Sequence, residues 1–137
     1  MVVTWLCHTY KQELIFSGRL FFLFVVFLHG MENQNYIERN KKAWNEKTKI
    51  HIQSKFYDQN AFMDGASSLK EIELELLGDV KGKRILHLQC HFGQDTLSWA
   101  RLGARATGVD MSDKAIEYAK LLNDELNLDA KFICSNV

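Results

Sequence analysis

Residues 85–110 decide the fold of this chain, and they read ILHLQCHFGQDTLSWARLGARATGVD. The apolar run that opens this stretch suits a buried strand, and Gly93 follows it in a tight turn. A helical pattern comes next and ends at Gly103, and a second apolar run then ends in Asp110. A strand, a tight turn, a helix and a second strand predict parallel strands joined by a helical crossover.

The same alternation continues beyond the stretch. Ser112 is suited to cap a helix that runs to Leu126 and carries one apolar face. In chain order we expect a strand over residues 84–90, a helix over 94–102, a strand over 105–109, a helix over 113–126 and a strand over 130–134. Right-handed crossovers place these strands in the order 3-2-1. The expected fold class is therefore α/β: a Rossmann-like, doubly wound parallel sheet, truncated after the third strand.

Helices are expected before the sheet. Residues 33–57 are polar with spaced aromatic residues, and we interpret them as one or two helices. Residues 58–67 are expected to form a loop. Ser68 and Glu71 have the spacing of a capping box, which predicts a helix that ends at Gly78. The apolar positions of that helix are Leu69, Ile72, Leu76 and Leu77.

Composition and charge narrow the class of protein. The chain has 137 residues, enough for one domain, with 17 basic and 17 acidic residues and no proline. This balance does not indicate a nucleic-acid or membrane-surface protein. The three cysteines are an odd number without paired spacing, which favours a reducing, cytoplasmic setting.

The first thirty residues differ from the rest. Residues 20–28 are an unbroken apolar run, about half the roughly 20 residues that span a bilayer. We therefore divide the chain into a hydrophobic extension (1–30) outside the domain, a helical region (31–79) and a cofactor-binding half-domain (80–137). A membrane-anchoring or signal-like role for residues 14–28 is the alternative.

The turn after the first strand and the acid after the second carry the chemistry. Free backbone N–H groups at the start of the helix suit an anionic group, and Gly93 allows a close backbone approach. Asp110 comes 19 residues after His91, where a carboxylate reaches ribose hydroxyls. The G-x-G-x-x-G fingerprint is absent, since Gln89, His91 and Gln94 occupy its positions, and so is a phosphate-binding loop.

Residues 80–137 resemble the first part of class I S-adenosylmethionine-dependent methyltransferases. The stretch ILHLQCHFG resembles the family's first motif, hydrophobic-Asp-x-Gly-x-Gly-x-Gly, with His87 in place of the Asp. Gln89 and His91 replace two of its glycines, and Gly93 is retained. The stretch GARATGVD resembles the second strand with its acidic ribose ligand, Asp110.

The resemblance implies S-adenosylmethionine as cofactor and methyl transfer as activity, with an unknown acceptor and the 137-residue chain itself inactive. It implies cofactor contacts at His87, Gln89, Cys90, His91, Gly93, Asp110 and Met111. Adenine contacts are implied just after the third strand, at about Ser135. Gln and His can replace these two glycines if the backbone φ angles there remain negative. No catalytic base is named.

Other interpretations stay open beside this one. A zinc site at His87, Cys90 and His91 lacks a second group of ligands, and Cys90 lacks a positioned base for a nucleophile. Trp44, Phe56 and Tyr57 are expected either to cap the cofactor site or to pack in the core. A non-catalytic S-adenosylmethionine- or nucleotide-binding module is the alternative function, and an NAD-type Rossmann protein is the weaker one.

Overall fold

The computed structural model describes residues 19–137. Its elements are α1 (Arg19–Ile52), α2 (Gln59–Met63), α3 (Glu71–Leu77), β1 (Arg84–Leu88), α4 (Gln94–Arg101), β2 (Arg105–Asp110), α5 (Asp113–Glu125) and β3 (Lys131–Cys134). The chain divides into two compact units, residues 1–34 and residues 35–137. The second unit contains all three strands of the sheet.

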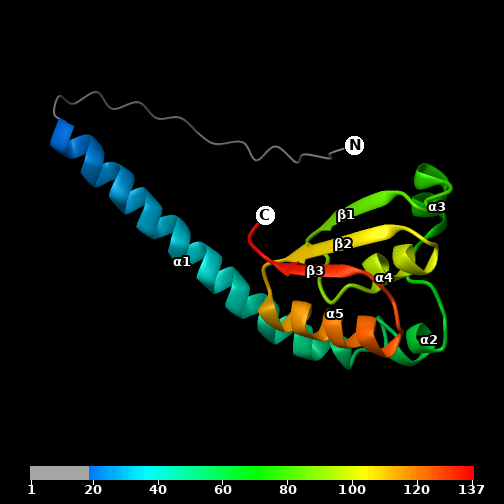
Figure 1. Ribbon diagram of the computed structural model, residues 1–137. Coiled ribbons are helices and arrows are strands. Elements are labelled where there is room, and N and C mark those ends of the chain that lie inside the picture. Colours follow the sequence, from blue (N-terminus) through cyan, green and yellow to red (C-terminus); the bar gives the residue numbers. More distant parts are fainter. Residues whose placement is uncertain (1–18) are drawn as a thin grey trace. The chain divides into compact units, whose positions relative to one another are not determined.

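Three parallel strands form the sheet, in the order β1-β2-β3. Leu86 of β1 pairs with Thr107 of β2, and Val109 of β2 pairs with Ile133 of β3. Figure 1 shows the three strands side by side, with β2 in the middle. The predicted α/β class, the parallel sheet and the strand order are confirmed. Consecutive strands joined by right-handed crossovers add to one edge of the sheet.

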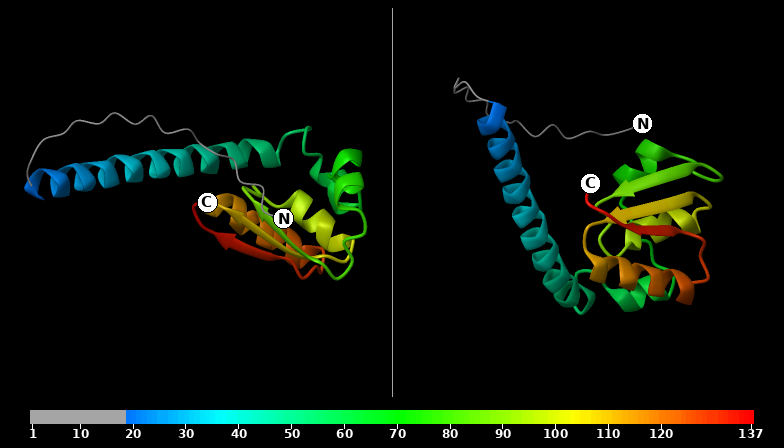
Figure 2. Two further views of the ribbon diagram at one scale, coloured as in Figure 1. Left: turned by 90° about the horizontal axis from the view of Figure 1, so that it is seen from above. Right: turned by 60° about the vertical axis from the view of Figure 1, so that its left-hand side comes forward.

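Two helices cover one face of this sheet, and Figure 2 shows α4 and α5 on the same side of it. Leu97 of α4 and Ala119 of α5 are completely buried, and Ile116 is nearly so. These side chains recur at helical spacing, so each helix turns one apolar face toward the strands. Ser112 caps α5 as expected: its Oγ accepts from the Ala115 N–H at 3.1 Å.

Phe132 of β3 is buried beneath two glycines from different parts of the chain. A Cβ atom on Gly93 would lie 2.6 Å from the Phe132 ring. A Cβ atom on Gly108 would lie 2.9 Å from the same ring and 2.7 Å from the Cys90 sulfur. Real Cβ atoms do not approach so closely, so both positions are filled by their neighbours.

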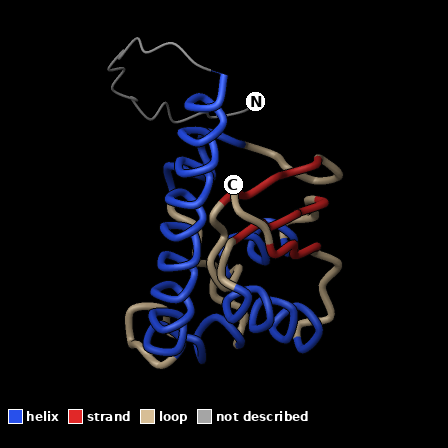
Figure 3. The backbone as a smooth tube through the Cα atoms, turned by 90° about the vertical axis from the view of Figure 1, so that its left-hand side faces the viewer, coloured by secondary structure: helices blue, strands red, loops and turns tan. Residues whose placement is uncertain are grey.

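The opposite face of the sheet carries exposed apolar side chains. Leu86 is 62% exposed, Leu88 44% and Ile133 51%. Side chains alternate between the two faces of a strand, and these three are out of phase with the buried residues Ala106 and Phe132. Figure 3 shows the strands with the loops that join them to α4 and α5.

The region before the sheet differs from the expectation at two places. Residues 59–63 of the predicted loop form α2, because the Asp58 carboxylate accepts from the Ala61 N–H and starts a helical turn. Helix α3 begins at Glu71, and the capping bond runs from the Lys70 N–H to the Glu73 carboxylate instead of joining Ser68 and Glu71.

The predicted apolar face of α3 is not buried. Ile72 is 62% exposed and Leu76 78%, and no residue of α3 is buried. Leu69 is buried, but it precedes the helix. Ser68 is held by Ser98 of α4, with the two hydroxyl oxygens 3.1 Å apart. The segment is therefore fixed by the residues before α3, and the helix itself packs loosely.

Helix α1 is one continuous helix of 34 residues, which begins before the region where we expected one or two helices. The predicted domain boundary at residue 30 falls inside it and remains a prediction. In the part of the chain that the structure describes, no helix is long and apolar enough to cross a membrane. Residues 14–18 of the signal-like alternative lie outside that part.

Candidate functional site

The candidate site lies at the carboxyl edge of the sheet, where β1 and β2 end. Two connections meet there: the β1–α4 loop, residues 89–93, and the β2–α5 turn, residues 111–112. Adjacent parallel strands bring these connections side by side, which is where α/β sheets bind ligands. Figure 3 shows both connections leaving the same ends of the strands.

Asp110 joins the two connections. Its Oδ2 accepts from the His91 N–H at 2.8 Å, and its Oδ1 accepts from the Ser112 N–H at 2.8 Å. The residue is 8% exposed. The two hydrogen bonds hold its carboxylate between backbone groups of both connections. Each oxygen retains a further lone pair, which is the acceptor capacity that a pair of sugar hydroxyls requires.

The β1–α4 loop has left-handed backbone at alternate residues. The φ angle is +57° at Gln89, +52° at His91 and +82° at Gly93. The condition of negative φ, under which side chains replace these glycines without strain, is therefore not met at Gln89 or His91. The loop keeps a backbone path suited to glycine although two residues carry side chains, at a cost of about 1–2 kcal/mol each.

Packing requires a glycine at position 93, and the sequence did not indicate this requirement. Its missing side chain makes room for Phe132 and for Ala119, 3.1 Å from the position of a Cβ atom. The Gly93 N–H donates to the Cys90 carbonyl, and the Gly93 carbonyl accepts from the Leu97 N–H at the start of α4. Close packing beneath the loop accounts for this glycine, and contact with a cofactor remains a proposal.

His87 is turned toward α4. Its Nδ1 lies 2.9 Å from the Thr96 hydroxyl, and burial lowers the pKa of the imidazole, against the nearby negative charges of Asp95, Glu73 and Asp110. The neutral form is therefore favoured at neutral pH. His87 thus lies close to the β1–α4 loop, but its ring is bound to Thr96 and joins β1 to α4.

Cys90 and Met111 border the same edge. Cys90 is 4% exposed, and burial, with Asp110 adding to it, raises the pKa of its thiol to about 12. A protonated, buried thiol is a packing group and not a nucleophile. Met111 is half-buried, and its carbonyl accepts from the Cys134 thiol at 3.6 Å, which joins the β2–α5 turn to β3.

The His91 imidazole lies among aromatic rings. Ring centroids are 4.3 Å away at Phe92, 5.1 Å at His51, 5.6 Å at Tyr57 and 5.9 Å at Trp44. Burial, with the neighbouring His51, lowers the pKa of His91 to about 4, and Asp110 opposes this shift. His91 is therefore neutral at neutral pH and acts as one member of an aromatic cluster.

Two of the three aromatic residues considered as a cap belong to this cluster. Trp44 comes from α1 and Tyr57 from the segment after it, and both flank His91. Phe56 is 85% exposed and contacts Tyr57 edge-on. The structure thus brings Trp44 and Tyr57 to the β1–α4 loop and leaves Phe56 at its margin.

A polar contact between α1 and the β2–α5 turn was not predicted from the sequence. Asn45 accepts from the Ser112 hydroxyl at 2.7 Å and donates to the Asp113 carboxylate at 2.8 Å. Thr48 is 1% exposed, and its hydroxyl lies 3.5 Å from both His91 Nε2 and Ser112 Oγ. Lys41 of the same helix lies 3.6 Å from the Asp113 carboxylate. The spacing i, i+4, i+7 of Lys41, Asn45 and Thr48, which puts the three on one helix face, was the signal available in the sequence.

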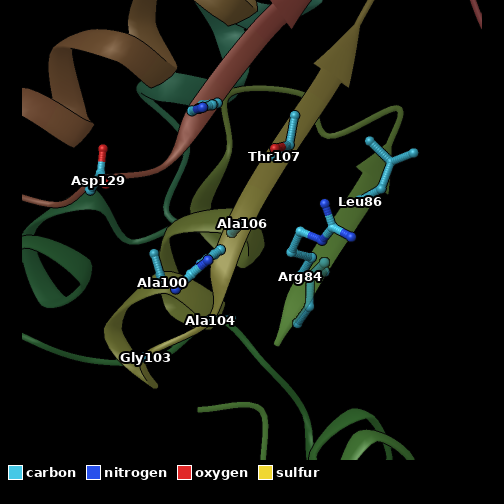
Figure 4. A pocket seen from close by; sticks show the side chains of 11 residues that line it. Arg84, Leu86, Ala100, Gly103, Ala104, Ala106, Thr107 and Asp129 are labelled. Atoms are coloured by element: carbon cyan, nitrogen blue, oxygen red, sulfur yellow. The ribbon is translucent and has the colours of Figure 1, made fainter. Parts of the chain in front are cut away.

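Two hollows lie on the second unit. A cavity of about 600 Å³ is bounded by Tyr57, Phe56, Gln94 and Asp95, so it adjoins the start of α4. Another, of about 830 Å³, lies at the amino ends of the strands, where Figure 4 shows Arg84, Leu86 and Thr107 around it. Only the first borders the candidate site, because the second is at the opposite edge of the sheet.

The site offers hydrogen-bonding groups and apolar walls. Asp110 supplies a carboxylate, the first turn of α4 supplies N–H groups, and the aromatic cluster supplies flat apolar surface. Among residues 19–137, no group of three or more His, Cys, Asp or Glu side chains is arranged to hold a metal ion. These groups suit a ligand that carries hydroxyls and a flat ring.

No family model matches the chain. A sequence relative is the ubiquinone biosynthesis O-methyltransferase of Alkalilimnicola ehrlichii, 36% identical over 58 residues. The match covers 42% of this chain and 24% of the relative, so the chain spans about a quarter of that relative's length. The chain is thus a distant, partial relative of methyltransferases.

Solved structures match in part. One is a protein studied for the conversion of a disulfide bond into a thioacetal group during echinomycin biosynthesis, 35% identical, with a TM-score of 0.44 over 53% of this chain and 30% of that chain. Another is the plantazolicin methyltransferase BpumL with a substrate analogue and SAH, 23% identical, with a TM-score of 0.38 over 74% of this chain and 44% of that one. Both TM-scores are below 0.5, so the fold assignment rests on the observed strand order and register.

Proposed function

We propose that the second unit binds S-adenosylmethionine at the carboxyl edge of β1 and β2, as part of a methyltransferase whose acceptor is unknown. Bound there, this cofactor supplies a methyl group on a sulfonium centre for attack by an acceptor. Catalysis of such a transfer depends mainly on positioning. The residues of this chain bind and orient the cofactor, and we assign no catalytic base.

Asp110 is the observation that carries this proposal. Its carboxylate is held by two backbone N–H groups from neighbouring connections, and it stands at the end of the middle strand. We assign it to the ribose hydroxyls. The groups present fit the rest of the ligand: N–H groups at the start of α4 suit the tail carboxylate, and the half-buried Met111 suits the adenine ring.

Calorimetry on the 137-residue chain tests the proposal with S-adenosylmethionine, S-adenosylhomocysteine and NADH as probes. We expect the first two to bind and NADH not to bind. Asp110→Asn is expected to weaken S-adenosylhomocysteine binding by about tenfold or more, since hydrogen bonds to a charged group are each worth about 1.5–3 kcal/mol.

Asp129→Asn is the matched control. Asp129 is exposed and lies by the other hollow, at the amino ends of the strands, so its loss should leave affinity unchanged. If neither S-adenosylmethionine nor S-adenosylhomocysteine binds the wild-type chain, the proposal is wrong. Binding of NADH in their place would support the NAD-type alternative, and methyl-transfer assays separate an enzyme from a non-catalytic binding module.

A further inference from the structure

The amino-acid tail of S-adenosylmethionine carries an ammonium group, and a carboxylate is the acceptor that binds such a group most strongly. Position 87, where the methyltransferase motif has an acid, holds a histidine whose Nδ1 is engaged by the Thr96 hydroxyl at 2.9 Å. Burial keeps the pKa of this imidazole low, so it adds no negative charge. If the tail is bound at the β1–α4 loop, a carboxylate elsewhere is needed to give its ammonium group a charged partner.

Three carboxylates line the cavity of about 600 Å³ beside that loop: Asp58, Glu73 and Asp95. The Asp58 carboxylate caps α2 by accepting from the Ala61 N–H at 3.2 Å. The Glu73 carboxylate caps α3 by accepting from the Lys70 N–H at 2.7 Å. Two of the three are therefore committed to the ends of short helices.

Asp95 has no such commitment. Among residues 35–137, no hydrogen bond or ion pair engages its carboxylate. It lies in the first turn of α4, two positions after Gly93, and the side chain is half-buried. An acid there interacts favourably with the helix dipole, but that interaction leaves its hydrogen-bonding capacity free.

The surroundings of Asp95 join it to the candidate site. The neighbouring Gln94 is buried, and its Nε2 donates to the Tyr57 carbonyl at 2.8 Å, which holds the segment after α1 against the start of α4. Burial lowers the pKa of His87 and raises that of Tyr57, and the charge of Asp95 acts to raise the pKa of both. Asp95, Gln94 and Tyr57 line the same cavity, so the carboxylate shares that cavity with a member of the aromatic cluster.

We propose that Asp95 binds the ammonium group of the cofactor's amino-acid tail, in place of the acid that position 87 lacks. This inference rests on the proposed function, because it concerns the tail of the same ligand. It makes Asp95 a determinant of specificity: the site selects ligands with an amino-acid tail over nucleosides without one. Asp110 then holds the ribose of the ligand, and Asp95 holds its amino-acid tail.

The test compares two probes that differ in the tail. S-adenosylhomocysteine carries the amino-acid tail, and 5′-methylthioadenosine keeps the adenosine and the sulfur without it. We expect Asp95→Asn to weaken S-adenosylhomocysteine binding by about tenfold to a hundredfold, the range for one charged hydrogen bond. Its affinity for 5′-methylthioadenosine should change less than about twofold, which also reports that the variant is folded.

Glu73→Gln is the matched control, since it removes a charge from the same cavity and keeps an oxygen for the Lys70 N–H. It should leave both affinities unchanged, and Asp95→Glu should retain most of the binding of S-adenosylhomocysteine. Equal S-adenosylhomocysteine affinity in Asp95→Asn and wild type would overturn the inference while the proposed function stands. Failure of the wild-type chain to bind any of the probes would overturn both.

Discussion

Two connections form the carboxyl edge of the sheet, and different forces hold them. In the β2–α5 turn, Asp110 accepts from the Ser112 N–H and Ser112 caps α5, so local hydrogen bonds define the path. In the β1–α4 loop, Gln89 and His91 adopt left-handed backbone that their side chains disfavour. The first connection is stable by its own chemistry, whereas the second depends on what packs against it.

The packing partners of the β1–α4 loop come from both sides. Phe132 of β3 lies beneath Gly93, and the aromatic rings of Trp44 and Tyr57 lie beside His91. A strained conformation persists where its surroundings hold it, and such sites are often functional. The comparison therefore predicts that substitutions in this loop act through packing, whereas those in the turn act through hydrogen bonds.

The largest expected effect comes from Gly93→Ala. The new Cβ would meet the Phe132 ring at 2.6 Å while the backbone has a φ of +82°. Left-handed strain and overpacking together should lower the free energy of unfolding by about 3 kcal/mol, measured by urea denaturation. Gly82→Ala separates the two causes, because Gly82 has a φ of +74° and nothing within 4 Å of the added atom.

If Gly93→Ala and Gly82→Ala lowered the free energy of unfolding equally, packing against Phe132 would not contribute to the effect at Gly93. The expected loss at Gly82 is only about 1 kcal/mol, the cost of the left-handed angle alone. Phe132→Leu should partly restore the free energy of unfolding that Gly93→Ala loses. Such a recovery would show that the additional loss at Gly93, compared with Gly82, comes from the contact with the Phe132 ring.

Gln89→Gly and His91→Gly should change the free energy of unfolding by intermediate amounts and in opposite directions. Both changes relieve a positive φ, but Gln89 is exposed and His91 contacts four aromatic rings. Gln89→Gly should raise the free energy of unfolding by about 0.5 kcal/mol, and His91→Gly should lower it by about 2 kcal/mol. The denaturation midpoints of the two variants, compared with wild type, measure these changes. A shift in the same direction in both variants would contradict the prediction.

The smallest expected effect is a pH dependence from His91. Its pKa is about 4 in the folded chain because of burial and His51, below the ordinary value of 6.5, so the unfolded chain binds the proton more tightly. The stability that the neutral ring contributes is complete above pH 6.5 and is lost as the pH falls toward 4. Because the ring is half-buried, screening limits the shift in melting temperature to about 4 °C.

Thermal melts at intervals from pH 7 to pH 5 measure this effect. His91→Gln should flatten the slope relative to wild type, while the other groups that face this edge, His51 and Asp110, stay in place. Parallel slopes in the two proteins would show that His91 does not titrate differently on folding.

The elements that the sequence predicted are those with local signals. The strand order, the Ser112 cap of α5 and the position of Asp110 follow from periodicity, capping chemistry and the alternation of strands and helices. The boundaries of α4 and α5 agree with the structure to within about one residue for the same reason.

The rest depends on contacts between distant residues. Asn45 meets Ser112 across 67 positions of sequence, and Thr48 meets His91 across 43, so no local pattern identifies these pairs. The left-handed angles at Gln89 and His91 contradict the preference of both residue types. At His91 the ring is held among four aromatic neighbours, which no local pattern specifies. The role proposed for Asp95 likewise depends on the hydrogen bonds of the neighbouring carboxylates, which no sequence pattern specifies.

Phe132 makes three positions depend on one another. Its ring occupies the space that side chains at Gly93 and Gly108 would need. One aromatic residue on β3 therefore sets the permitted size at the end of the β1–α4 loop and in the middle of β2. Volume at these positions is shared: a larger group at either glycine requires a smaller one at Phe132. An evolutionary path that alters one of the three therefore passes through a less stable intermediate unless the compensating change comes first.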